Sequence, residues 1–226
     1  MKLKNSNIID LFINSVIVIT TVLAVGAYFV TGPDILGSSG TACFKYFTTD
    51  SNVLAAIASL IMLFYNIKRI REPEFAVPRW LELLKFAGTA SVALTFLTVL
   101  FFLAPMGFMR GGFKTFFFFF KGNVFVLHAS TPILSVLSLT LFEPGCKFSL
   151  KDSFWALIPT IVYSLVYLVM VVFVRRWNDW YGFTFGGKPF MAPISMLAMY
   201  LVTLGIASVL RKLKRVEADN RIKVRK

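Results

Sequence analysis

The chain has 226 residues, of which 57% are hydrophobic and 16% aromatic, and its net charge is +13. This apolar content exceeds that of ordinary soluble domains and indicates a bilayer protein. The basic residues lie between apolar stretches and near the C-terminus, which disfavours nucleic acid as a partner. One histidine and two isolated cysteines, Cys43 and Cys146, have no metal-ligand spacing. We therefore expect neither a metal site nor another cofactor.

Six apolar segments are long enough to cross a hydrocarbon core of roughly 30 Å. They are Ile8–Val30, Tyr46–Ile67, Trp80–Leu103, a stretch from about 123 to 142, Ser153–Val174 and Phe190–Leu210. Turns that contain glycine, proline and charged residues separate them. The sequence thus predicts an all-α polytopic membrane protein. Residues 1–210 form its domain of six transmembrane helices, and a basic cytoplasmic tail covers 211–226.

The distribution of positive charge predicts the orientation. With the N-terminus inside, the inner segments carry 16 Lys and Arg residues and the outer loops carry 7. The positive-inside rule then places both termini in the cytoplasm. We expect a multi-pass protein of the plasma membrane, the inner membrane in a bacterium. The tail is interpreted as a topology anchor, with contact to anionic lipid as the alternative.

Five consecutive polar residues, Thr48 to Asn52, open the second apolar segment, at its predicted outer end. Such residues are preferred helix caps, so capping and a reactive role are both open for Thr48. A hydroxyl at a helix start lies beside backbone N–H groups that have no intrahelical partner and can stabilise an oxyanion. Asn52 follows one turn later on the same face, and Thr49 and Asp50 complete the candidate binding or oxyanion group.

The single histidine, His128, falls about one turn inside the outer end of the fourth segment, at a depth similar to that of Thr48. A lone intramembrane histidine either hydrogen-bonds between helices or serves a function. A neutral imidazole is the form required of a general base. Pro132 follows at i+4, where we expect it to free a backbone carbonyl and kink the helix.

Three further features carry alternatives. The outer loop Trp177–Phe183 is either an aromatic membrane anchor or a lid in which Asp179 or Tyr181 orients His128. The run Phe116–Phe120, at the outer end of the fourth segment, is expected to be an interfacial anchor or to pack between helices rather than to bind a ligand. Lys85, near the inner end of the third segment, is expected to extend toward the membrane surface, and we assign it no chemistry.

Two short stretches carry a resemblance to a known family. Lys45–Thr48 and His128–Pro132, in a six-span plan, resemble the nucleophile and histidine segments of the androgen-induced protein family. The loop around Tyr181 is similar to a Trp/Tyr-Pro-Phe stretch there, although Gly182 stands in place of that proline. The proline after the histidine also falls at a different offset. A bacterial six-helix membrane family whose second span begins Tyr-Phe-Thr-x-x-Ser-Asn is more similar still.

That family consists of six-helix membrane hydrolases of fatty-acid esters of hydroxy fatty acids. The resemblance implies that Thr48 is a nucleophile and His128 its general base. The leading hypothesis is therefore an integral-membrane lipid ester hydrolase near the outer interface, with a lipid substrate that enters laterally. A small-solute transporter or channel is the alternative, disfavoured by the scarcity of polar residues at mid-membrane depth. An acyltransferase on the same scaffold is a further alternative.

Overall fold

The computed structural model describes residues 2–30, 39–72, 75–143 and 147–225, and these contain helices and no strand. Six helical segments are long and apolar enough to cross a membrane: Asn5–Val30, Phe47–Arg71, Arg79–Phe118, Gly122–Phe142, Leu150–Phe173 and Met191–Val216. The predicted all-α architecture with six candidate membrane helices is confirmed.

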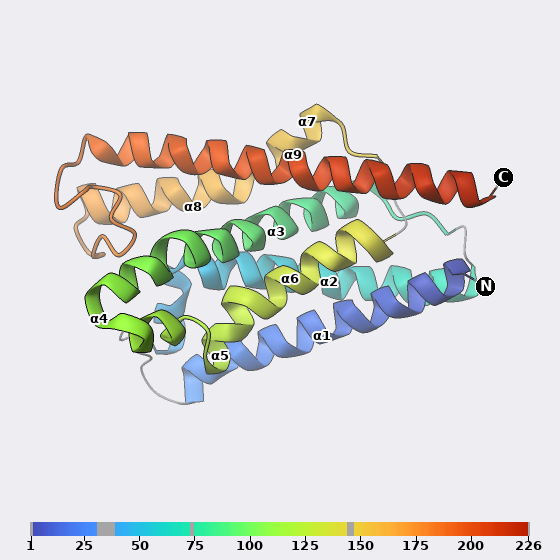
Figure 1. The fold of residues 1–226 in the computed structure, drawn as a ribbon, viewed down its shortest axis with the longest axis horizontal. Coiled ribbons are helices and arrows are strands. Elements are labelled where there is room, and N and C mark those ends of the chain that lie inside the picture. The colour runs from blue at the N-terminus through green and yellow to red at the C-terminus, as the bar shows by residue number, and fades with distance from the viewer. Residues whose placement is uncertain (1, 31–38, 73–74, 144–146, 226) are drawn as a thin grey trace.

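The helices run roughly along one axis, and the first helix begins at the same end of the bundle at which the last one finishes (Figure 1). We call this the terminal end, and the other, which holds the 174–190 loop, the loop end. Helix α1 (Lys2–Val30) packs along α2 (Phe47–Arg71), and α2 packs along α3 (Arg79–Thr98). The long final helix, α9 (Met191–Arg225), packs on the other side of α3. It continues through the predicted basic tail as far as Arg225.

Helix α3 is the central helix, because every residue from Lys85 to Thr95 is buried. Small side chains on this stretch allow neighbouring backbones to approach closely. A Cβ atom added to Gly88 would lie 3.2 Å from the Cα of Ala55 on α2. The close packing of the bundle around α3 therefore depends on the small residues of this helix, which has neighbours on several sides.

The third membrane segment is longer than predicted. It continues from α3 through the π-helical turn η2 (Val99–Leu103) into α4 (Ala104–Phe118). The prediction ended it before Pro105, but a proline just after a π-turn is accommodated without ending the helix. The bend comes later, at Gly111 and Gly112, and Gly112 has φ +64°, a value that favours glycine. Residues 116–118 therefore belong to α4, and the fourth segment begins shortly after them, at Gly122.

The fourth and fifth segments also alternate α-helix with π-helical turns. The fourth comprises α5 (Gly122–Phe125), η3 (Val126–Ser130), α6 (Thr131–Leu137) and η4 (Ser138–Phe142). The fifth comprises α7 (Leu150–Trp155), α8 (Ile158–Leu168) and η5 (Val169–Phe173). A short 3-10 helix, η1 (Gly40–Lys45), precedes α2 at the loop end. Such π-turns release backbone carbonyls from the regular hydrogen-bond ladder of the helix.

Candidate functional site

The first turn of α2 presents the Thr48 hydroxyl without using it as a cap. The N-cap residue makes no side-chain cap, and its carbonyl accepts from the amides of Thr49 and Asp50 at 3.0 and 3.3 Å. The Phe47 amide donates to a tyrosine hydroxyl. Among the described residues, none accepts a hydrogen bond from the Thr48 N–H. The donor beside the Thr48 hydroxyl is thus its own amide, whereas the neighbouring amides are occupied.

Thr48 lines a cavity of about 520 Å³, part of whose wall is the 174–190 loop. The walls come from α2, α3, η2, α8, the 174–190 loop and α9, and they are mainly apolar, with Leu94, Phe101, Met199 and Val202 among them. A few hydroxyls interrupt this lining. Thr49, by contrast, is buried and is not among the lining residues. The arrangement suits an apolar chain whose polar group lies at Thr48.

Tyr181 is the group in contact with Thr48. It lines the same cavity as Thr48 and Tyr163, and its hydroxyl accepts a hydrogen bond from the Phe47 amide at 3.2 Å. The Tyr163 hydroxyl donates in turn to the carbonyl of Lys45 at 2.7 Å. Burial raises the pKa of Tyr181 to about 12, against the opposing effect of the polar groups of Tyr163, Phe47 and Thr48. At neutral pH Tyr181 is therefore an uncharged phenol beside Thr48.

Asp179 organises the loop that carries Tyr181. Its carboxylate accepts from the Tyr167 hydroxyl at 2.9 Å, from the Phe183 amide at 2.8 Å, and from the amide and hydroxyl of Thr184 at 2.7 and 2.6 Å. Burial acts to raise the pKa of Asp179, but these donors outweigh it and hold the pKa below its usual range. Among the described residues, no hydrogen bond joins Asp179 or Tyr181 to His128.

His128 lies in η3 and is buried. Its Nδ1 lies 2.9 Å from the carbonyl oxygen of Phe119. Because a carbonyl only accepts, Nδ1 carries the hydrogen and Nε2 remains an acceptor, as a general base requires. His128 is not among the residues that line the cavity, and no hydrogen bond joins it to Thr48 within the described chain. The structure thus brings Thr48 and Tyr181 together but leaves His128 outside this contact.

Asn52 connects α2 to the turn that contains His128. The Thr131 amide bonds the carbonyl of Val126, five residues back, and Pro132 has no N–H. The carbonyl of Leu127 therefore lacks a regular main-chain partner, and Asn52 Nδ2 donates to it at 2.9 Å.

The second hydrogen of this amide goes to the carbonyl of Thr48 at 2.7 Å. Because both of its hydrogens are used, Asn52 is not free to donate to an oxyanion as arranged here. Its role in this arrangement is to fix the position of His128 relative to α2. The buried Oδ1 atom of Asn52 has no partner among the described residues.

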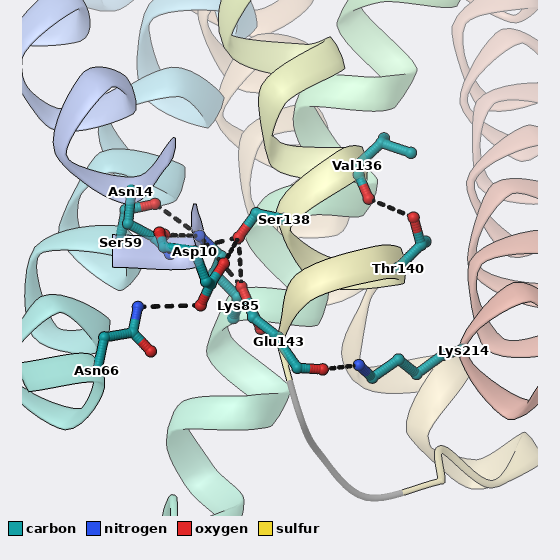
Figure 2. Close-up of polar contacts among 10 residues, drawn as sticks. All are labelled: Asp10, Asn14, Ser59, Asn66, Lys85, Val136, Ser138, Thr140, Glu143 and Lys214. Atoms are coloured by element: carbon teal, nitrogen blue, oxygen red, sulfur yellow. Dashed lines mark hydrogen bonds and ion pairs between the residues drawn. The ribbon is translucent and has the colours of Figure 1, made fainter. Parts of the chain in front are cut away.

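A buried group of charges at the terminal end was missed by the sequence analysis. Lys85 is only 1% exposed, so the expectation that it extends to the membrane surface is wrong. Its ammonium group donates to Asn14 and Ser59 and lies 3.4 Å from Glu143 Oε1 (Figure 2). The central place of α3 explains this, because helices surround it on several sides. The sequence feature that could have predicted this buried group is the pair Asp10 and Asn14, which share one face of α1 at i and i+4.

Among the described residues, no three His, Cys, Asp or Glu side chains are arranged to hold a metal ion. The fold and the site define a helical polytopic membrane protein with a hydroxyl-bearing apolar cavity. Comparisons with protein-family models, with curated proteins and with solved structures find no match to this chain.

Proposed function

We propose that this protein is an integral-membrane hydrolase of lipid esters, with Thr48 as its nucleophile. The observation that carries the proposal is the Thr48 hydroxyl on the wall of an apolar cavity, beside an amide with no partner among the described residues. The cavity, at about 520 Å³, is in the range of small-molecule sites and suits an acyl chain. A lipid that enters laterally from the bilayer would place its ester at the cavity wall.

In the proposed reaction, Thr48 Oγ1 attacks the acyl carbonyl, the ester C–O bond breaks, and the alcohol leaves with a proton. Water then cleaves the acyl-enzyme and regenerates the hydroxyl. The Thr48 N–H is the donor nearest to the developing oxyanion, and such a donor stabilises this charge. Tyr181 lines the cavity wall together with Thr48.

The base in this proposal is His128. A neutral phenol is a poor proton acceptor, which leaves the unprotonated Nε2 of His128 as the better base. Catalytic hydrogen bonds often tighten only when substrate is bound, so the proposal requires Nε2 to reach Thr48 Oγ1 in that complex. In the same proposal both termini face the cytoplasm and the cavity lies toward the outer side of the plasma membrane, as the distribution of Lys and Arg indicates.

The test compares purified wild type, Thr48→Ala and Thr49→Ala in detergent micelles with fatty-acid esters of hydroxy fatty acids as substrates. We expect Thr48→Ala to abolish hydrolysis and acyl-enzyme formation, observed by mass spectrometry. Thr49→Ala should retain both, because Thr49 does not line the cavity. His128→Gln should slow acyl-enzyme formation without loss of lipid binding. Normal turnover by Thr48→Ala would refute the proposal.

A second candidate, a small-solute transporter, is favoured by the buried charges at the terminal end. Intramembrane ionisable groups often mark ion or proton pathways. Solute flux into proteoliposomes in the absence of ester cleavage would favour this candidate. An acyltransferase on the same scaffold would differ from the hydrolase in the acceptor alone, so analysis of the lipid products separates the two.

A further inference from the structure

The buried charge cluster joins five parts of the bundle at the terminal end, away from the cavity that contains Thr48. No member is more than 5% exposed. The members are Asp10 and Asn14 from α1, Ser59 and Asn66 from α2, Lys85 from α3, Ser138 from η4, Glu143 directly after η4, and Lys214 from α9 (Figure 2). Ionised groups so deeply buried are costly unless each is paired and hydrogen-bonded.

Ser138 lies between the two carboxyl groups of the cluster. Its Oγ lies 2.7 Å from Asp10 Oδ1 and 2.7 Å from Glu143 Oε1, and it accepts from Asn14 Nδ2 at 3.3 Å. A hydroxyl has one hydrogen and two acceptor lone pairs. Ser138 can therefore donate to only one of the two carboxyl groups. The other contact is a hydrogen bond only if that carboxyl carries a proton and donates to Ser138.

A second observation also indicates a shortage of hydrogens in the cluster. Asn66 donates to Asp10 Oδ2 at 2.9 Å, yet its own Oδ1 atom is buried and has no donor among the described residues. A buried acceptor without a donor is costly, so this part of the cluster has fewer hydrogens than acceptors. The missing donor at Asn66 Oδ1 is separate from the missing hydrogen at Ser138, and both residues contact Asp10.

We propose that this cluster is a proton-binding site in which one proton is shared between Asp10 and Glu143 through Ser138. Lys85 lies 3.4 Å from Glu143 Oε1 and compensates the remaining carboxylate. Lys214 donates to the main-chain carbonyl of Glu143. Ser59 and Asn66, the two α2 side chains that hydrogen-bond within the cluster, are uncharged.

The bound proton links the first membrane segment to the end of the fourth. Without it, two carboxylates compete for one hydroxyl hydrogen, and α1 and η4 repel each other at this point. The site depends on neither Thr48 nor the cavity, so it stands whether or not the protein is an ester hydrolase. Its ligand is a proton exchanged at the terminal end of the bundle.

Infrared difference spectroscopy tests the proposal, because a protonated carboxyl has a C=O stretching band distinct from that of a carboxylate. We expect this band in the wild-type protein in lipid bilayers at neutral pH. It should be lost in at least one of Asp10→Asn and Glu143→Gln. The matched control is Glu82→Gln, which removes a carboxylate paired with Arg79 at 3.2 Å outside the cluster and should leave the band unchanged.

Ser138→Ala provides a measurement that keeps both carboxyl groups. Removal of the bridging hydroxyl should shift the frequency of the band, because the protonated carboxyl loses its hydrogen-bond partner. The absence of a protonated-carboxyl band at neutral pH would overturn the proposal. A band that survives both acid-to-amide substitutions, or that does not shift in Ser138→Ala, would overturn it as well.

Discussion

Replacement of Asn52 by leucine tests the role of this residue in holding the His128 turn. The substitution keeps a side chain of similar size but removes the donor to the carbonyl of Leu127. That carbonyl has no regular main-chain partner, because η3 is π-helical and Pro132 lacks an N–H. The variant therefore leaves a buried carbonyl without a hydrogen bond.

The expected cost is about 1–3 kcal/mol of unfolding free energy, the penalty of one orphaned buried acceptor. The Thr48 carbonyl contributes little to this figure, because the Ser51 hydroxyl still donates to it at 3.1 Å. Loss of the unpartnered Oδ1 atom of Asn52 offsets part of the cost. The value should therefore lie toward the lower half of the range.

A double-mutant cycle makes the prediction specific. Pro132→Ala returns an N–H at the position from which an i→i−5 bond reaches the Leu127 carbonyl. In that background Asn52→Leu should cost less than in the wild type, by about 1 kcal/mol, because the carbonyl has gained a main-chain donor. The coupling thus reports on this one carbonyl rather than on general loosening of the helix.

The assay is equilibrium unfolding in mixed micelles for the wild type, both single variants and the double variant. The control is Asn178→Ala, an exposed asparagine whose loss should change stability by less than about 0.5 kcal/mol. Additive effects of Asn52→Leu and Pro132→Ala, to within about 0.5 kcal/mol, would refute the reasoning about the Leu127 carbonyl.

Two further predictions concern charged side chains. Asp179→Asn should destabilise the 174–190 loop by about 1–3 kcal/mol. Because the folded pKa of Asp179 is lowered, the stabilisation of the loop by this carboxylate is present above a pH of about 4 and is lost as the pH falls through the folded pKa. Tryptophan fluorescence of the loop should detect this loss in the wild type but not in the variant. Lys85→Met should cost about 3–5 kcal/mol in unfolding assays, because it leaves buried carboxyl groups without their cation. The exposed Lys188→Met is its control, and equal effects of the two lysine variants would contradict the buried role of Lys85.

The helical architecture was predictable because it depends on local properties of the chain. A run of about 20 apolar residues must satisfy its backbone hydrogen bonds internally, so hydropathy alone predicts membrane helices and their number. The same logic failed at Pro105, because a π-turn accommodates a proline that in an ordinary α-helix would have ended the segment.

Sequence alone also singled out Thr48, Asn52 and His128, since polar residues in apolar segments need a partner or a function. It did not determine which of them meet. Whether Tyr181 or His128 lies beside Thr48 depends on how the 174–190 loop folds over α2. Asp179 holds this loop through hydrogen bonds to residues that are close in the sequence, but the sequence alone did not reveal these bonds.

The burial of Lys85 was likewise decided by packing. A lysine near the end of an isolated membrane helix can reach the interface, but α3 is enclosed by helices that supply Asn14, Ser59 and Glu143. Length, hydropathy and charge along the chain thus determined a six-helix membrane protein with a polar start to its second helix. Only the tertiary structure decided which polar groups share a site, because those contacts join residues that are far apart in the sequence.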